Sequence, residues 1–176
     1  FESPSVEGMV DGYGISLFAA TQQKEDSRKN RQVTVLQFNT NSPFIGGIGA
    51  GTLEMVTFLQ SFDVLSPYEV PKGEWSKKHM IRVENKKLAD EYFTEDRVRI
   101  LNQVLSVPKS DVLALLDKQD GIFRFETSNP LHDLPKLEAL VQKVIVRLNK
   151  LKLTEAEEKS FSSELNETSA GTTQEE

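Results

Sequence analysis

The chain lacks cysteine, has only two histidines among its 176 residues, and contains no long apolar run. The absence of cysteine excludes a disulfide scaffold, a thiol nucleophile and a cysteine-based zinc site. Two histidines, His79 and His132, are too few for a histidine-rich metal centre, so we predict no metal site. No stretch approaches the roughly 18 apolar residues of a membrane-spanning helix, so we expect a soluble chain without a membrane span.

The net charge of the chain lies at its C-terminal end. Residues 154–176 carry seven Glu and one Lys, a net charge of −6, which equals the net charge of the whole chain. Residues 1–153 therefore balance near zero, and they exert no long-range attraction on nucleic acid or on an anionic membrane.

Composition divides the chain into three parts. Residues 1–13 are rich in glycine, serine and acidic side chains and predict an irregular N-terminal arm. Residues 14–153 hold the apolar residues of a single domain, whereas residues 154–176 have few large apolar side chains and predict an acidic disordered tail. The chain starts at Phe1 rather than methionine, which leaves two alternatives open, a processed mature chain or a fragment. The localisation is unknown at this point.

Hydrophobic periodicity predicts an α+β fold with an N-terminal antiparallel hairpin and a mostly helical C-terminal half. Alternating apolar residues in 14–22 and 32–40 predict the two strands of the hairpin. From Asp133 to Leu153, apolar residues recur at intervals of three and four, which predicts a long amphipathic final helix. Further predicted elements are strands at 78–85 and 121–127 and helices at 52–62, 94–107 and 109–119.

Four glycines fall within six residues in the motif GGIGAG at 46–51. A phosphate-binding loop needs backbone N–H groups that converge at a helix N-terminus, and the helix predicted from Thr52 offers such an end. The spacing does not fit the dinucleotide fingerprint or the lysine-containing nucleotide loop. IGAGT resembles the glycine loop of methyltransferases that use S-adenosylmethionine, which implies Gly47, Gly49, Gly51 and Thr52 as cofactor-binding residues. The favoured interpretation is a strand-to-helix turn without a cofactor, where glycine permits close packing.

Residues 72–87 combine basic side chains with a tryptophan. Single-stranded nucleic acid binds such segments, because phosphates need cations and unstacked bases need flat partners. The alternative is a solvated surface segment that its tryptophan anchors to the core. The candidate nucleic-acid-binding residues are Lys72, Trp75, Lys77, Lys78, Arg82, Lys86 and Lys87.

The apolar stripe of the last predicted helix is a candidate protein-binding surface. Its candidate partner-binding residues are Leu137, Val141, Val144, Leu148 and Leu151. Packing in the chain's own core is the alternative use of such a stripe. Because no motif identifies a reaction, we predict a non-enzymatic interaction or assembly module, a subunit of a larger complex that binds a protein partner or itself. Nucleic-acid binding through residues 72–87 is the alternative function.

Overall fold

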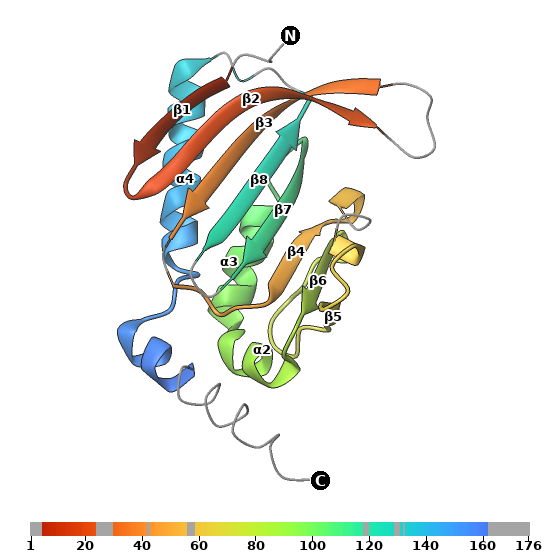
Figure 1. The fold of residues 1–176 in the computed structure, drawn as a ribbon, viewed down its shortest axis with the longest axis vertical. Helices are drawn as coiled ribbons and strands as arrows, with labels where there is room; N and C mark the ends of the chain where they lie inside the picture. The colour runs from red at the N-terminus through yellow and green to blue at the C-terminus, as the bar shows by residue number, and fades with distance from the viewer. Residues whose placement is uncertain are drawn as a thin grey trace, which may run out of the picture.

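The computed structural model describes residues 5–23, 30–41, 43–55, 59–117, 120–128, 131 and 133–161. Their centre is one antiparallel sheet with the strand order β1-β2-β3-β8-β7-β4-β6-β5 (Figure 1). The strands are β1 (Ser5–Val10), β2 (Tyr13–Gln23), β3 (Asn30–Thr40), β4 (Ile48–Thr52), β5 (Ser66–Pro67), β6 (His79–Val83), β7 (Ser110–Leu116) and β8 (Gly121–Thr127). The helices are η1 (Leu53–Met55), α2 (Lys86–Tyr92), α3 (Glu95–Leu105) and α4 (Leu134–Asn149), and residues 155–161 are also helical.

The N-terminal part of the sheet is a three-stranded meander. β2 and β3 pair antiparallel, as their alternating pattern predicts. β1 pairs with the other side of β2 through a two-residue turn at Asp11 and Gly12, whose φ angles are 49° and 81°. Two successive positive φ values are typical of a type I′ turn, which suits the twist of a tight hairpin. β1 lies within the stretch that composition assigns to an irregular arm.

The prediction of a mostly helical C-terminal half is wrong, because β7 and β8 lie in the middle of the sheet. β8 matches its predicted strand, but β7 occupies residues for which we predict a helix. Val112 and Ala114 of β7 belong to the main core, whereas Leu113 belongs to a second cluster on the opposite face. A strand buried on both faces has a continuous apolar pattern, and periodicity cannot distinguish that pattern from a buried helix.

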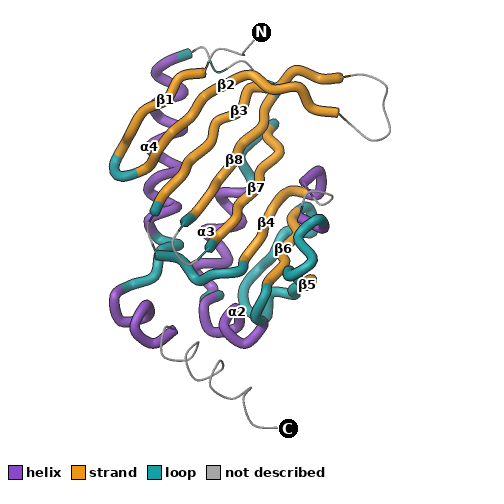
Figure 2. The backbone as a smooth tube through the Cα atoms, in the orientation of Figure 1, coloured by secondary structure: helices purple, strands orange, loops and turns teal. Residues whose placement is uncertain are grey.

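The helices α3 and α4 cover one face of the sheet (Figure 2). Phe38 and Phe125 meet there edge to face with their ring centroids 5.7 Å apart. Thr94 caps α3 and Asp133 caps α4, each by accepting a backbone N–H three residues later, and both positions match the predicted helix starts. No helix among the described residues is long and apolar enough to cross a membrane.

The prediction of a long final helix is also wrong. α4 ends at Asn149, and a separate helical segment, residues 155–161, follows it. Arg97 of α3 donates to both carboxylate oxygens of Glu157 at 2.9 and 2.8 Å, and Phe161 is buried in the main core. Residues 155–161 therefore pack on the domain, although composition predicts disorder there, and residues 162–176 lie outside the described residues.

The segment after β4 covers part of the opposite face. The helix predicted at 52–62 does not begin at Thr52, because Thr52 is the last residue of β4; Leu53–Met55 form the short helix η1, and residues 59–60 are helical. Residues 56–58 lie outside the described residues. Met55 and Leu59 pack on β7 in a small cluster, which closes this face of the sheet over β4 and β7.

Candidate functional site

The second half of the glycine motif lies inside the sheet, in β4, and Gly46 and Gly47 come directly before that strand. Gly49 and Gly51 belong to β4 and pair with both β6 and β7, so their backbone polar groups take part in a sheet. A Cβ atom at Gly49 would lie 2.8 Å from the Leu59 side chain, and one at Gly51 would lie 2.9 Å from the carbonyl oxygen of Val112. Glycine therefore allows the covering segment and β7 to approach β4 closely.

The other two candidate cofactor-binding residues also have structural roles. Gly47 has a φ of 71°, and a Cβ there would lie 2.5 Å from the Glu84 side chain. The Thr52 hydroxyl accepts the backbone N–H of Val112 at 3.2 Å, which joins β4 to β7. Sheet pairing and close packing account for these glycines and for Thr52, so the geometry gives the cofactor hypothesis no support.

The basic segment 72–87 is spread over a loop, β6 and α2. Lys78 lies at one end of β6 beside a hollow that also contains His79, whereas Lys86 and Lys87 line a different hollow at the other end. Lys72 and Lys77 are exposed in the loop before β6. The structure therefore does not bring the predicted nucleic-acid-binding cations together on one track.

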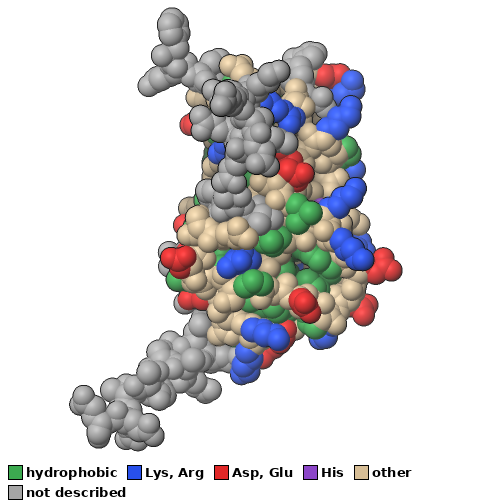
Figure 3. All heavy atoms as spheres, turned by 90° about the vertical axis from the view of Figure 1, so that its right-hand side faces the viewer, with side chains coloured by type: hydrophobic (Ala, Val, Ile, Leu, Met, Phe, Trp, Pro, Cys, Tyr) green, Lys and Arg blue, Asp and Glu red, His purple; other side chains and the backbone are tan. Residues whose placement is uncertain are grey.

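Two members of the basic segment bond to the chain's own backbone. The Arg82 guanidinium donates to the Leu65 carbonyl oxygen at 2.9 Å, and the Trp75 indole N–H donates to the His79 carbonyl oxygen at 3.2 Å. Trp75 also meets the His79 ring edge to face. On the face that Figure 3 shows, the Lys and Arg side chains of the described residues are interspersed with Asp and Glu.

His79 is held in one orientation by a neighbouring helix. Its Nδ1 lies 2.9 Å from the Asn102 side-chain oxygen, so Nδ1 carries the proton and donates to that oxygen. The hollow beside it contains cations of Lys78 and Lys109 but also acids of Glu54 and Asp111. This mixed lining favours no ligand of one charge, and among the described residues no group of acidic, histidine or cysteine side chains could hold a metal ion.

The predicted partner-binding stripe of α4 is divided between the core and the surface. Val144, Leu148 and Leu151 are fully buried against the sheet, so they stabilise the chain's own fold. Leu137 and Val141, at the N-terminal half of the stripe, line an open groove between α4 and the strands β1 and β2. Of these two residues, Leu137 is half-buried and within reach of a partner, whereas Val141 is buried at the base of the groove.

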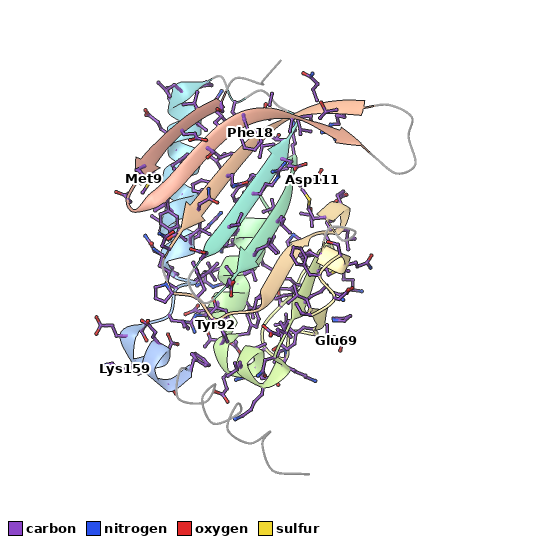
Figure 4. All side chains as sticks on the ribbon, in the orientation of Figure 1. Met9, Phe18, Glu69, Tyr92, Asp111 and Lys159 are labelled. Carbon is purple, nitrogen blue, oxygen red and sulfur yellow. The ribbon has the colours of Figure 1, made fainter. Side chains whose placement is uncertain are left out.

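This edge groove has a volume of about 480 Å³ and is mainly apolar. Val6 of β1 is 69 % exposed and Leu134 of α4 is 61 % exposed, whereas Met9, which is 72 % exposed, lies on the opposite face of β1. Figure 4 shows Met9 at the outer margin of the sheet. Single exposed apolar side chains are common on protein surfaces, but several around one groove are typical of an interaction site.

No protein-family model, curated protein or solved structure matches this chain. The functional argument therefore depends on the placement of its side chains. The edge groove combines exposed apolar residues with an open edge strand. Neither the glycine motif nor the basic segment 72–87 presents such a surface to a partner.

Composition assigns β1, which forms one wall of the groove, to an irregular arm. The dipeptide Asp11-Gly12 is a turn signal of the type I′ hairpin, and Val10 and Tyr13 flank it. Val6, Gly8 and Val10 also alternate with Glu7 and Met9. These two signals together were enough to predict a strand before the hairpin, but the small and acidic residues favoured an irregular arm.

Proposed function

We propose that the chain is a non-enzymatic protein-interaction module, a subunit of a larger complex, and that it binds its partner through the edge groove. The observation that carries this proposal is the apolar groove itself, where the exposed side chains of Val6 on β1 and Leu134 on α4 line opposite walls. Covering this surface removes apolar area from water, at about 25 cal/mol for each Å² buried. A groove also holds a partner's side chains on two walls, which a flat patch does not.

The arrangement of charge supports a protein partner over nucleic acid. The described residues that line the edge groove include Glu138 of α4 but neither Lys nor Arg. Phosphate groups would be repelled there. The cations of residues 72–87, in turn, lie on separate elements. Lys78 shares one hollow with Glu54, and Lys86 and Lys87 share another with Glu84.

A charged substitution in the groove tests this proposal. Leu134→Glu places a carboxylate on the apolar wall, and Val146→Glu is the matched control, because Val146 lies on the same helix and is 55 % exposed away from the groove. A photo-cross-linking residue at position 137 should give discrete adducts in extract of the source cells. Leu134→Glu should reduce those adducts about tenfold or more, as is typical of a central interface residue, and Val146→Glu should not.

Sedimentation of the purified chain over a range of concentrations distinguishes the two kinds of partner. Self-association that Leu134→Glu abolishes identifies a second copy as the partner, whereas a monomer that still gives adducts in extract identifies another protein. Adducts that respond equally to Leu134→Glu and Val146→Glu would contradict the proposal.

A further inference from the structure

We infer that the partner binds as an extended segment of alternating apolar and basic residues that adds one antiparallel strand to β1. This inference rests on the proposed function and names the kind of partner that fits the edge groove. Its first support is a difference between the two edges of the sheet. β5, at one edge, has two residues and contains Pro67, whereas β1, at the other edge, has six residues and contains neither proline nor lysine.

Edge strands present unpaired backbone groups, and proteins usually protect them with shortness, proline, charged side chains (lysine above all) or a bulge. β5 has two of these protections, whereas β1 has a single charged side chain, Glu7. β1 pairs regularly with β2 from Ser5 to Val10, without a bulge, and within the described residues it has no second neighbour. The backbone of β1 is therefore open to a further strand.

The turn geometry shows which backbone groups of β1 are open. In a two-residue hairpin the residues that flank the turn exchange hydrogen bonds, so Val10 bonds to Tyr13. Hydrogen-bonded and non-bonded pairs alternate along an antiparallel ladder. Gly8 therefore also bonds to β2, whereas the N–H and C=O groups of Glu7 and Met9 point away from the sheet. These four groups are the positions where an added strand would bond.

The side chains of the added strand would meet two different surroundings. Val6 and Val10 pair with β2 residues that face α4, so the partner's side chains on that face would enter the edge groove beside Leu134. Apolar residues fit this face. On the opposite face they would lie next to Glu7, where a basic residue completes an opposite-charge cross-strand pair.

Charge distinguishes this partner from a second copy of the chain. Glu7 lies on the face of β1 that points away from α4, whereas Glu138 of α4 lines the groove on the other face. A second β1, with the sequence SVEGMV, has no basic residue and would bring a second Glu7 beside the first. A foreign segment of alternating apolar and basic residues supplies the missing charge.

A synthetic peptide tests strand addition on the full chain. The probe is acetyl-Lys-Val-Lys-Val-Thr-Val-Lys-amide, and its controls are a peptide of the same composition without alternation and one with Glu in place of Lys. Hydrogen exchange measured by NMR should show slower exchange at the N–H groups of Glu7 and Met9 when the probe binds. The N–H of Gly8, already bonded to β2, should change little.

Two further changes remove only the proposed backbone bonds. Glu7→Pro removes the N–H group that points away from β2, and an edge strand accepts proline at such a position. Glu7→Thr is the matched control, because it also removes the charge but keeps the N–H group. Glu7→Pro should weaken probe binding at least tenfold relative to Glu7→Thr. In case the proline variant does not fold, probes N-methylated on alternate residues provide the same test, because methylation of only one of the two alternating sets should abolish binding.

The outcomes separate this inference from the proposed function. Loss of the cellular adducts in Leu134→Glu, but not in Glu7→Pro relative to Glu7→Thr, would overturn strand addition and leave the interaction surface standing. Binding of the probe without exchange protection at Glu7 and Met9, equal binding of the non-alternating peptide, or no binding of the probe would also overturn strand addition. Unchanged adducts in Leu134→Glu would overturn the proposed function itself.

Discussion

Replacing Glu157 with glutamine should destabilise the whole domain, although the residue lies in a segment whose composition predicts disorder. The Arg97 guanidinium is 9 % exposed and makes four hydrogen bonds, two to Glu157 and one each to the carbonyl oxygens of Tyr92 and Lys152. It also lies over the Tyr92 ring, 4.5 Å from the centroid. Glutamine keeps one acceptor for this guanidinium but leaves its charge without a counter-charge.

The size of the effect follows from the pKa of Glu157. Hydrogen bonding to Arg97 lowers the pKa of this carboxyl from 4.5 to about 2, against the opposing effect of burial. Each pKa unit corresponds to about 1.4 kcal/mol, so the full shift corresponds to roughly 3 kcal/mol. The Glu157 side chain is 34 % exposed, and solvent screening reduces the expected free-energy loss to about 2 kcal/mol. For a domain of this size, that loss lowers the thermal midpoint by about 4–8 °C.

The pH dependence provides a sharper test than the midpoint alone. Because folding lowers the pKa of Glu157, its stabilising contribution is complete above pH 4.5 and is lost as the pH falls toward 2. Urea unfolding at several pH values should therefore show a difference between wild type and Glu157→Gln of about 2 kcal/mol at pH 7, which disappears near pH 2. Glu155→Gln, at an exposed position of the same segment, should show no such difference. An equal difference at pH 7 and pH 2.5, or none at pH 7, would refute the reasoning.

Three further predictions concern other parts of the chain. Gly51→Ala should lower the free energy of unfolding by about 1–3 kcal/mol in urea titrations, because the new Cβ meets backbone, and Gly8→Ala, with open space around it, should change it by less than about 0.5 kcal/mol. Equal effects would contradict the close-packing role of Gly51. Phe161→Ala should lower the free energy of unfolding by about 3 kcal/mol, since its buried ring is removed, and an unchanged thermal midpoint would mean that this segment does not pack on the domain. Replacing Lys77 and Lys78 with Glu should not change oligonucleotide affinity, which we expect to be weak in both proteins at every salt concentration. If the wild type instead binds with a steep salt dependence that the variant lacks, the nucleic-acid alternative would be supported.

The sequence predicts elements well where a local signal and the tertiary role agree. Thr94 is followed by an acidic first turn and a regular apolar spacing, and α3 starts where these signals indicate. The strand at 121–127 alternates cleanly because Phe123 and Phe125 enter the core while Arg124 lies on the other face. The local pattern in both cases reports the same two environments that the folded chain provides.

Predictions fail where the environment is set by distant segments. β7 is covered on one face by helices and on the other by Leu59, which comes from more than 50 residues earlier in the chain. Glu157 reads as one of several tail acids until the fold places it against Arg97, 60 residues away. The sequence indicates neither contact, because composition and periodicity describe a segment by itself.

The edge groove could not be predicted from the helix that forms one of its walls. The stripe on α4 is continuous in sequence, yet Val144 and Leu148 lie over the sheet while Leu134 and Leu137 extend beyond the cover of its central strands. What divides the stripe is the strand order, in which β1 is the last strand on that side. The apolar stripe of α4 is longer than the part of the sheet that covers it, so its N-terminal residues lie beside the open strand β1. Both walls of the groove therefore result from the same feature of the topology, and a partner strand would extend the sheet and cover the remaining stripe at the same time.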